Sequence, residues 1–387
     1  MTPGPTEASG ADTTWRIDSP ADAPPVWTNA SAGLEPGRRD GAALAYDAWR
    51  GRLLLVGGRD LDPALGTGTY FADSWEFNGD WWELRPVPPT LAGRAEHGLA
   101  FDAARGDAVL FGGIADDGLR GDTWRYDGDH WTDASGGVAP SPRRGATMTY
   151  DATAGAVVLF GGEDASGPRD DTWRWDGAAW AELAVGTRPP ARALAGFAFD
   201  AATDRLVLFG GVGAAGALAD TWFFDGTTWT DAALAAHPPA GRAALAFDPA
   251  RGRVLAFEGS ALWELATTWQ PINASAAPPV VTGNAVAYDG WTRQLATFGG
   301  DAGVIGERTL ARFAFASDAY PPEACADGEA DTDGDGLAGC ADPDCWAVCA
   351  PGCPPLTSCA AAAPTCGDGA CAEWRETVAS CPEDCAP

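Results

Sequence analysis

Short apolar stretches separated by polar turns fill most of the chain. Within each stretch, apolar and polar residues alternate over four or five positions, which is the pattern of a β-strand with one buried face. Asp and Gly gather between the stretches, as in residues 151–155 and in Asp176-Gly177, and both residues favour tight reversals. One such unit predicts four strands, at residues 146–150, 156–160, 172–175 and 180–183.

This four-stranded unit recurs along the chain. Its first strand ends in an aromatic-Asp pair, at Tyr46-Asp47, Phe101-Asp102, Tyr150-Asp151, Phe199-Asp200, Phe247-Asp248 and Tyr288-Asp289. Its second strand ends in a glycine pair, at Gly57-Gly58, Gly112-Gly113, Gly161-Gly162, Gly210-Gly211 and Gly299-Gly300, with Glu258-Gly259 in the fifth copy. A unit of this size cannot bury both of its faces alone, so the repeat predicts that the copies stack on one another.

A glycine pair after the second strand, an aromatic residue on the third and a tryptophan on the fourth resemble the kelch repeat. The resemblance covers residues 26–316 and implies an all-β fold, a six-bladed kelch-type β-propeller. Two copies depart from it. The fifth lacks the glycine pair and has a short connection at 260–262, and the sixth has Leu310 where the others have Trp75, Trp124, Trp173 and Trp222.

The sixth copy ends after Phe315 without a fourth strand. Residues 26–31, which include Trp27, are similar in sequence to residues 131–135 of the second copy. We therefore expect an N-terminal strand to complete the last blade and close the propeller, which removes an exposed sheet edge.

Several polar and aromatic residues recur once per copy, which favours structural roles. The recurrent tryptophans are expected to pack in the core. Arg94, Arg144, Arg192 and Arg242 are expected to form hydrogen bonds at the blade starts, and the alternative is that they line the central channel and bind an anion. Asp122, Asp171 and Asp220 are expected to bond at turns and strand entries rather than to act in catalysis.

The connections between second and third strands vary most, from 59–74 in the first copy to 301–309 in the sixth. Binding usually occurs on variable loops of a rigid scaffold, so this face is the predicted binding face. The alternative is exposed variation without a ligand. The candidate residues are Arg59, Asp60, Asp62, Tyr70, Asp116, Asp117, Arg120, Glu163, Asp164, Arg169 and Asp301.

Composition narrows the function classes. The net charge of −29 disfavours nucleic acid and anionic membranes as partners, and no apolar run reaches the roughly 20 residues of a transmembrane helix. His97, His130 and His237 occupy different positions of the repeat, so we do not expect them to converge on a copper ion. Common nucleophile and zinc-hydrolase motifs are absent.

The sequence favours a non-enzymatic binding or adhesion protein with a protein or glycan ligand; the alternative is a carbohydrate-active enzyme with a carboxylate pair in the propeller funnel.

The composition changes at Asp318, where apolar strand patterns give way to acidic residues, proline and cysteine. A dense cysteine cluster in a short acidic segment predicts disulfide bonds and an oxidising compartment, with zinc binding as the alternative. The cysteines are Cys325, Cys340, Cys345, Cys349, Cys353, Cys359, Cys366, Cys371, Cys381 and Cys385.

Alternating aspartates in the tail match the start of a calcium-binding loop. Residues 331–336 place carboxylates at loop positions 1, 3 and 5 and glycine at position 6. Clustered carboxylates prefer a hard cation, so calcium is the expected ligand, and a disordered acidic linker is the alternative. The candidate metal ligands are Asp331, Asp333, Asp335, Asp342 and Asp344.

Two tail segments, 325–345 and 366–385, resemble a metal-binding motif and a small cysteine-rich module of bacterial cell-surface proteins. The resemblance implies a secreted or cell-surface protein, although residues 1–11 show no hydrophobic export segment. We expect a monomer with four parts: an N-terminal extension (1–24), the propeller (25–317), a linker (318–324) and the tail (325–387).

Overall fold

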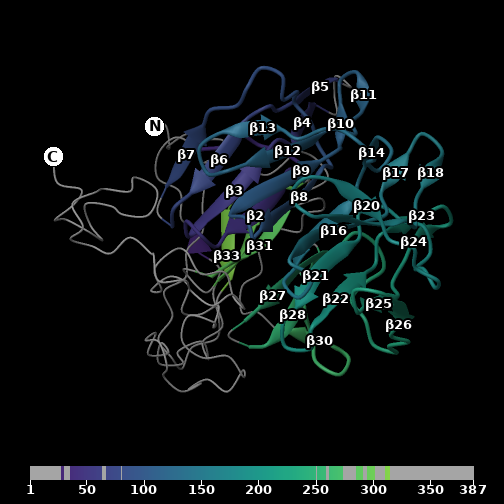
Figure 1. Cartoon of the computed structure of the whole chain (residues 1–387). Helices are drawn as coiled ribbons and strands as arrows, with labels where there is room; N and C mark the ends of the chain where they lie inside the picture. Colours follow the sequence, from purple (N-terminus) through teal and green to yellow (C-terminus); the bar gives the residue numbers. More distant parts are fainter. Residues whose placement is uncertain are drawn as a thin grey trace, which may run out of the picture.

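The structure, a computed structural model, describes residues 28–29, 35–62, 67–79, 81–249, 251–258, 261–272, 285–290, 294–300 and 310–313. Every helix or strand element within these ranges is a β-strand (Figure 1). The predicted N-terminal extension, the linker and the whole cysteine-rich tail lie outside the described residues, as does Asp301.

Six four-stranded antiparallel sheets, numbered here 1 to 6, account for most of the described chain. Sheet 1 contains β2 (Ala43–Asp47), β3 (Arg52–Val56), β6 (Ser74–Phe77) and β7 (Trp82–Arg85). Sheet 2 contains β8 (Gly98–Asp102), β9 (Asp107–Phe111), β12 (Thr123–Tyr126) and β13 (Trp131–Asp133). Sheet 3 contains β15 (Thr147–Asp151), β16 (Ala156–Phe160), β19 (Thr172–Trp175) and β20 (Trp180–Glu182).

Sheets 4 to 6 repeat the same order. Sheet 4 contains β21 (Gly196–Asp200), β22 (Arg205–Phe209), β25 (Thr221–Phe224) and β26 (Trp229–Asp231). Sheet 5 contains β27 (Ala244–Asp248), β28 (Arg253–Glu258), β29 (Ala261–Leu265) and β30 (Trp269–Ile272). Sheet 6 contains β31 (Ala285–Asp289), β32 (Gln294–Phe298), β33 (Leu310–Phe313) and β1 (Thr28–Asn29).

Sheet 6 combines the first strand of the described chain, β1, with its last three strands. β1 pairs antiparallel with β33, with Thr28 opposite Arg312, so an N-terminal strand forms the edge of the last sheet as predicted. The register of β33 also corrects one prediction. Leu310 lies opposite Phe298 just as Thr221 lies opposite Phe209, so Ala311, and not Leu310, occupies the position of the recurrent tryptophan.

The first strands of the sheets contact one another in series. β2 contacts β8, β8 contacts β15, β15 contacts β21, β21 contacts β27, β27 contacts β31, and β31 contacts β2. Each hydrophobic cluster likewise draws on two neighbouring sheets; Leu54 of sheet 1, for example, packs with Leu110 and Trp131 of sheet 2. The apolar face of one sheet is therefore buried only by the next sheet, as the repeat predicted.

The recurrent tryptophans are buried, as predicted, and some of them link neighbouring sheets. Trp75, Trp124, Trp173 and Trp222 are all less than 9% exposed. On the fourth strands, Trp180 Nε1 donates a hydrogen bond of 2.9 Å to Thr123 Oγ1 of the preceding sheet. Trp229 and Trp269 make the equivalent bonds to Thr172 and Thr221.

An arginine, an aspartate and a tryptophan form one hydrogen-bonded unit in each of sheets 1 to 4, and in each unit the arginine and the tryptophan are buried. In sheet 3, Arg143 donates to both carboxylate oxygens of Asp171 at 2.6 and 2.9 Å, and Trp173 Nε1 donates to the same carboxylate at 2.8 Å. The equivalent trios are Arg39, Asp73 and Trp75; Arg94, Asp122 and Trp124; and Arg192, Asp220 and Trp222. The prediction of hydrogen bonds at the blade starts is therefore confirmed for Arg94 and Arg192. It is also confirmed for Arg144, which donates to Glu163 and Glu96, although its neighbour Arg143 holds the buried position of the trio. It is wrong for Arg242, which has an ion pair with Glu96 at 3.9 Å and no hydrogen bond in the described part of the chain.

The glycine pairs join sheets 1 to 4 and sheet 6 to the sheet that follows each of them. At Gly161 φ is +61°, and a Cβ atom there would lie 2.5 Å from the carbonyl oxygen of Arg192. The following amide, that of Gly162, donates a 2.9 Å hydrogen bond to this carbonyl. The same link connects Gly300 of sheet 6 to the carbonyl of Arg39 before sheet 1, at 3.0 Å. Only glycine fits this close approach of two backbones.

The connections between second and third strands contain small hairpins that the sequence analysis did not predict. They occur in sheets 1 to 4 and lie along the top and right of the view in Figure 1. Their strands are β4 (Arg59–Asp62) with β5 (Thr67–Tyr70), β10 (Ile114–Ala115) with β11 (Gly118–Leu119), β17 (Glu163–Asp164) with β18 (Gly167–Pro168), and β23 (Val212–Gly213) with β24 (Gly216–Ala217). β14 (Arg143–Arg144) pairs with β17, so this hairpin also covers the start of sheet 3.

Candidate functional site

A cavity of about 220 Å³ lies where the first strands of all six sheets meet. Sheets 1 to 5 each contribute four consecutive residues to its lining, and the first of these four are Gly41, Glu96, Gly145, Leu194 and Arg242. Sheet 6 contributes Ala285 and Val286. These lining residues begin beside the hairpins, so this end of the cavity lies on the predicted binding face.

Hydrogen bonds between backbones connect the lining residues of neighbouring sheets at this end. The amide of Glu96 donates to the carbonyl of Gly41, that of Gly145 to Glu96, and that of Leu194 to Gly145, each at 2.7 Å. All four residues have positive φ, including Glu96 at 55° and Leu194 at 59°. Side chains rarely adopt this conformation, and such strain gathers at functional sites.

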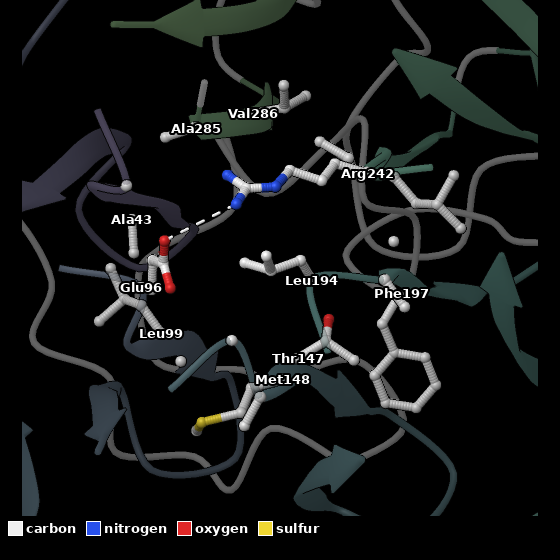
Figure 2. A pocket seen from close by; sticks show the side chains of 18 of the residues that line it. Ala43, Glu96, Leu99, Thr147, Met148, Leu194, Phe197, Arg242, Ala285 and Val286 are labelled. Carbon is white, nitrogen blue, oxygen red and sulfur yellow. Dashed lines mark ion pairs between the residues drawn. The ribbon is translucent and has the colours of Figure 1, made fainter. Parts of the chain in front are cut away.

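Glu96 is the centre of a charged network at the cavity. Its side chain is 2% exposed and lies 3.3 Å from Arg59, 3.3 Å from Arg144 and 3.9 Å from Arg242. Figure 2 shows Arg242 extending across the cavity toward Glu96. A buried carboxylate requires such partners, because its desolvation costs several kcal/mol.

The outer arginines of this network have carboxylate partners of their own. Arg59 donates to both oxygens of Asp40, and Arg144 donates to Glu163 at 2.7 Å. Burial would lower the pKa of Arg59, but its hydrogen bonds to Asp40 and the charge of Glu96 outweigh burial and raise that pKa. Arg59 is therefore firmly charged, and hydrogen bonds to carboxylates hold both Arg59 and Arg144 in place.

Below this network the cavity is lined mainly by apolar side chains. Leu99, Met148, Leu194, Phe197 and Val286 surround it (Figure 2). A few charged groups beside an apolar cavity are typical of small-molecule sites.

His97 also borders the cavity and is buried, and neither ring nitrogen has a hydrogen-bond partner among the described residues. Burial, with a smaller contribution from the charge of Arg94, lowers the pKa of His97 to about 3, so it is neutral near pH 7. His130 is exposed between β12 and β13, and His237 contacts the carbonyl of Pro238. Within the described ranges, no group of three or more His, Cys, Asp or Glu residues is arranged to hold a metal ion.

The predicted binding-face residues lie in different environments. Arg59 and Glu163 join the network around Glu96, whereas Asp116, Asp117 and Arg169 are exposed on the hairpins. Of the others, Asp60 pairs with Arg38, Tyr70 lies opposite Arg59, Arg120 pairs with Asp117, and Asp164 accepts a hydrogen bond from Ser141. Asp62 lies on β4 opposite Thr67, and nothing is described of its side chain.

The sequence analysis did not identify Glu96 or Asp40 as site residues, and it gave Arg144 and Arg242 a structural role first. A usable signal was present, because both Glu96 and Arg242 interrupt a position that is glycine in the first and third copies. The alternative that recurrent arginines line a central channel applies to Arg242, which lines the cavity, and not to Arg94 or Arg192, which are buried in trios.

No protein-family model matches the chain, and no curated protein matches it. No helix in the described part of the chain is long and apolar enough to cross a membrane.

Proposed function

We propose that this protein is an extracellular or cell-surface binding protein, built on a six-bladed, kelch-type β-propeller whose hairpin face binds a protein or glycan. The closed propeller is supported by the serial contacts of the first strands and by the link from Gly300 to Arg39. A closed ring of sheets leaves only short, protected inner edges and gives a rigid platform.

One observation carries the binding role: recurrent polar residues are used within the scaffold, whereas two charged residues that interrupt the repeat line the cavity on the hairpin face. Asp122, Asp171 and Asp220 each bind an arginine and a tryptophan. Glu96 and Arg242 interrupt the repeat and meet at the cavity. Variable side chains on a rigid scaffold are where binding functions usually occur.

The alternative of a carbohydrate-active enzyme has less support. Glycoside hydrolysis requires two carboxyl groups on either side of the bond that is cleaved. Among the described residues lining the cavity, Glu96 is the one carboxylate, and three arginines surround it.

The tail remains a separate proposal. Its cysteines would form disulfides, and Asp331, Asp333 and Asp335, with Asp342 or Asp344, would bind calcium and stabilise the tail. Calorimetric titration of the full chain with calcium should show binding that is lost in the Asp333→Ala/Asp335→Ala variant. Equal binding by both proteins would contradict the assignment.

Binding at the hairpin face can be tested on a glycan array with the full chain. Asp117→Ala changes the tip of the β10–β11 hairpin, where the side chain is 69% exposed and pairs with Arg120. The matched control is Asp129→Ala between β12 and β13, where the side chain is 70% exposed and pairs with Arg85. A bound glycan should lose affinity only with Asp117→Ala. An equal loss with both variants would contradict a hairpin-face site, and an array without hits would favour a protein ligand.

A further inference from the structure

Arg242 differs from the other two arginines around Glu96. Arg59 donates hydrogen bonds to the carboxylates of Asp40 and Glu96. Arg144 donates hydrogen bonds to those of Glu163 and Glu96. In the described part of the chain, Arg242 has one charged neighbour, Glu96, at 3.9 Å, which is too long for a hydrogen bond. Its guanidinium can therefore accept a new anionic partner without breaking a hydrogen bond.

Glu96 does not require Arg242 for charge compensation. Two closer guanidinium groups, those of Arg59 and Arg144, both lie 3.3 Å from its carboxylate. An anion that draws Arg242 away would therefore leave Glu96 paired on two sides.

Sheet 5, which contributes Arg242 to the cavity, lacks the hairpin that sheets 1 to 4 have. In sheets 1 to 4 a hairpin follows the second strand, but β28 ends at Glu258 and β29 begins at Ala261, with Glu258 opposite Ala261. Only two residues of the sequence separate β28 from β29 in sheet 5, where sheet 4 has β23 and β24. Accordingly, 40% of the Arg242 side chain is exposed although it lines the cavity.

The cavity beneath Arg242 suits a small apolar group. Its volume of about 220 Å³ is below the roughly 300–1,000 Å³ of pockets for drug-sized ligands. Leu99, Leu194 and Phe197 line it, and Figure 2 shows Leu194 between Glu96 and Phe197. A ligand with one ring or a short alkyl chain matches this size.

We propose that this central cavity binds a small organic carboxylate, which enters beside sheet 5, pairs with the guanidinium of Arg242 and places its apolar part against Leu194 and Phe197. This site goes beyond the hairpin-face function, because its ligand lies in the central cavity rather than on the hairpins and is much smaller than a protein or glycan. Arginine suits the role, since its planar fork binds a carboxylate through two parallel hydrogen bonds.

Calorimetric titration of the full chain with phenylacetate tests this site, with phenylacetamide as the uncharged analogue. Phenylacetate should bind, and Arg242→Gln should weaken it about tenfold or more, as expected for loss of a charged hydrogen bond. Arg242→Lys should recover part of the affinity. Thr147→Leu, which adds volume to the lining of the cavity, should also weaken binding while Arg242 is intact.

Arg169→Gln is the matched control. Arg169 follows the β17–β18 hairpin, its side chain is 43% exposed, and its carboxylate neighbour Asp164 lies 3.6 Å away, so it resembles Arg242 in exposure and pairing but does not line the cavity. No binding of phenylacetate, equal binding of phenylacetamide, or equal losses with Arg242→Gln and Arg169→Gln would each overturn the proposal. None of these results would affect the hairpin-face function, which Asp117→Ala tests separately.

Discussion

Sheets 3 and 5 share their strand order but differ at one end. Sheet 3 has the buried ion pair Arg143–Asp171, with the arginine 1% and the aspartate 8% exposed, and the β17–β18 hairpin above it. In sheet 5, Gly241 takes the place of the arginine. The carbonyl of Gly241 accepts a hydrogen bond from the amide of Gly211, just as the carbonyl of Arg192 accepts one from the amide of Gly162. Ala261 replaces the aspartate, because Leu262 lies opposite Phe257 as Thr221 lies opposite Phe209.

The arginine, the aspartate and the hairpin are therefore lost together. A buried charge without its partner is strongly destabilising, so neither member of the pair is retained without the other. The comparison indicates that the trio supports the hairpin, and that its loss in sheet 5 opens the face beside Arg242.

The largest expected effect follows from leaving one buried charge alone. Asp171→Ala strands the guanidinium of Arg143 and should lower the free energy of unfolding by about 3–5 kcal/mol. The double variant Arg143→Ala/Asp171→Ala copies sheet 5 and should lose less than Asp171→Ala alone. Urea unfolding followed by tryptophan fluorescence measures both, and a double variant as unstable as the sum of the two single variants would contradict this account.

A smaller effect is expected at the glycine link between sheets. Gly161→Ala places a Cβ atom 2.5 Å from the Arg192 carbonyl at a φ of +61°, and should destabilise the fold by about 1–3 kcal/mol. The control is Gly186→Ala, where no atom lies within 4 Å of the added Cβ. Thermal unfolding should separate the two variants, and equal melting temperatures would show that this contact relaxes freely.

Acid should affect the sheets unequally. Burial alone would raise the pKa of Asp122, Asp171 and Asp220, but hydrogen bonds from arginine and tryptophan outweigh it and lower these pKa values below 3.8. A carboxyl group whose pKa is lower in the folded than in the unfolded chain stabilises the fold at pH values above its unfolded pKa. This stabilisation is lost as the pH falls through the pKa of the folded state.

We therefore expect the stability that the trios contribute to be lost below about pH 4, so that acid lowers the stability of Arg143→Ala/Asp171→Ala less steeply than that of the unchanged protein. Hydrogen exchange at low pH should show faster opening in sheets 2 to 4, while sheet 5 changes less. Uniform acid sensitivity of all the sheets would argue against a special role of the trios.

The smallest effect is expected for an ion pair on a hairpin. Asp117 and Arg120 are 2.6 Å apart, but their side chains are 69% and 31% exposed. Asp117→Ala should therefore change the free energy of unfolding by less than about 0.5 kcal/mol, because water screens exposed pairs. A loss similar to that of Asp171→Ala would remove the distinction between trio and hairpin.

Periodicity alone was sufficient to predict the four main strands of each sheet and the structural roles of the recurrent tryptophans and aspartates. β16 and β19 have the predicted bounds, and Asp171 and Trp173 have structural roles as expected. These features follow from local alternation and turn chemistry, which repeat in each copy. The sequence did not show that Arg143 rather than Arg144 holds the trio position, because two adjacent arginines fit the same pattern and only burial distinguishes them.

The composition of the candidate site depended on the tertiary structure. Glu96 and Arg242 lie far apart in the sequence and belong to sheets 2 and 5, so their contact requires all the first strands to lie around one cavity. Sequence spacing fixes which side of a strand a residue occupies, but not which distant side chain it meets. The packing of the sheets around the cavity determines this contact. It places Glu96, which interrupts the repeat in the second copy, beside Arg242, which interrupts it in the fifth.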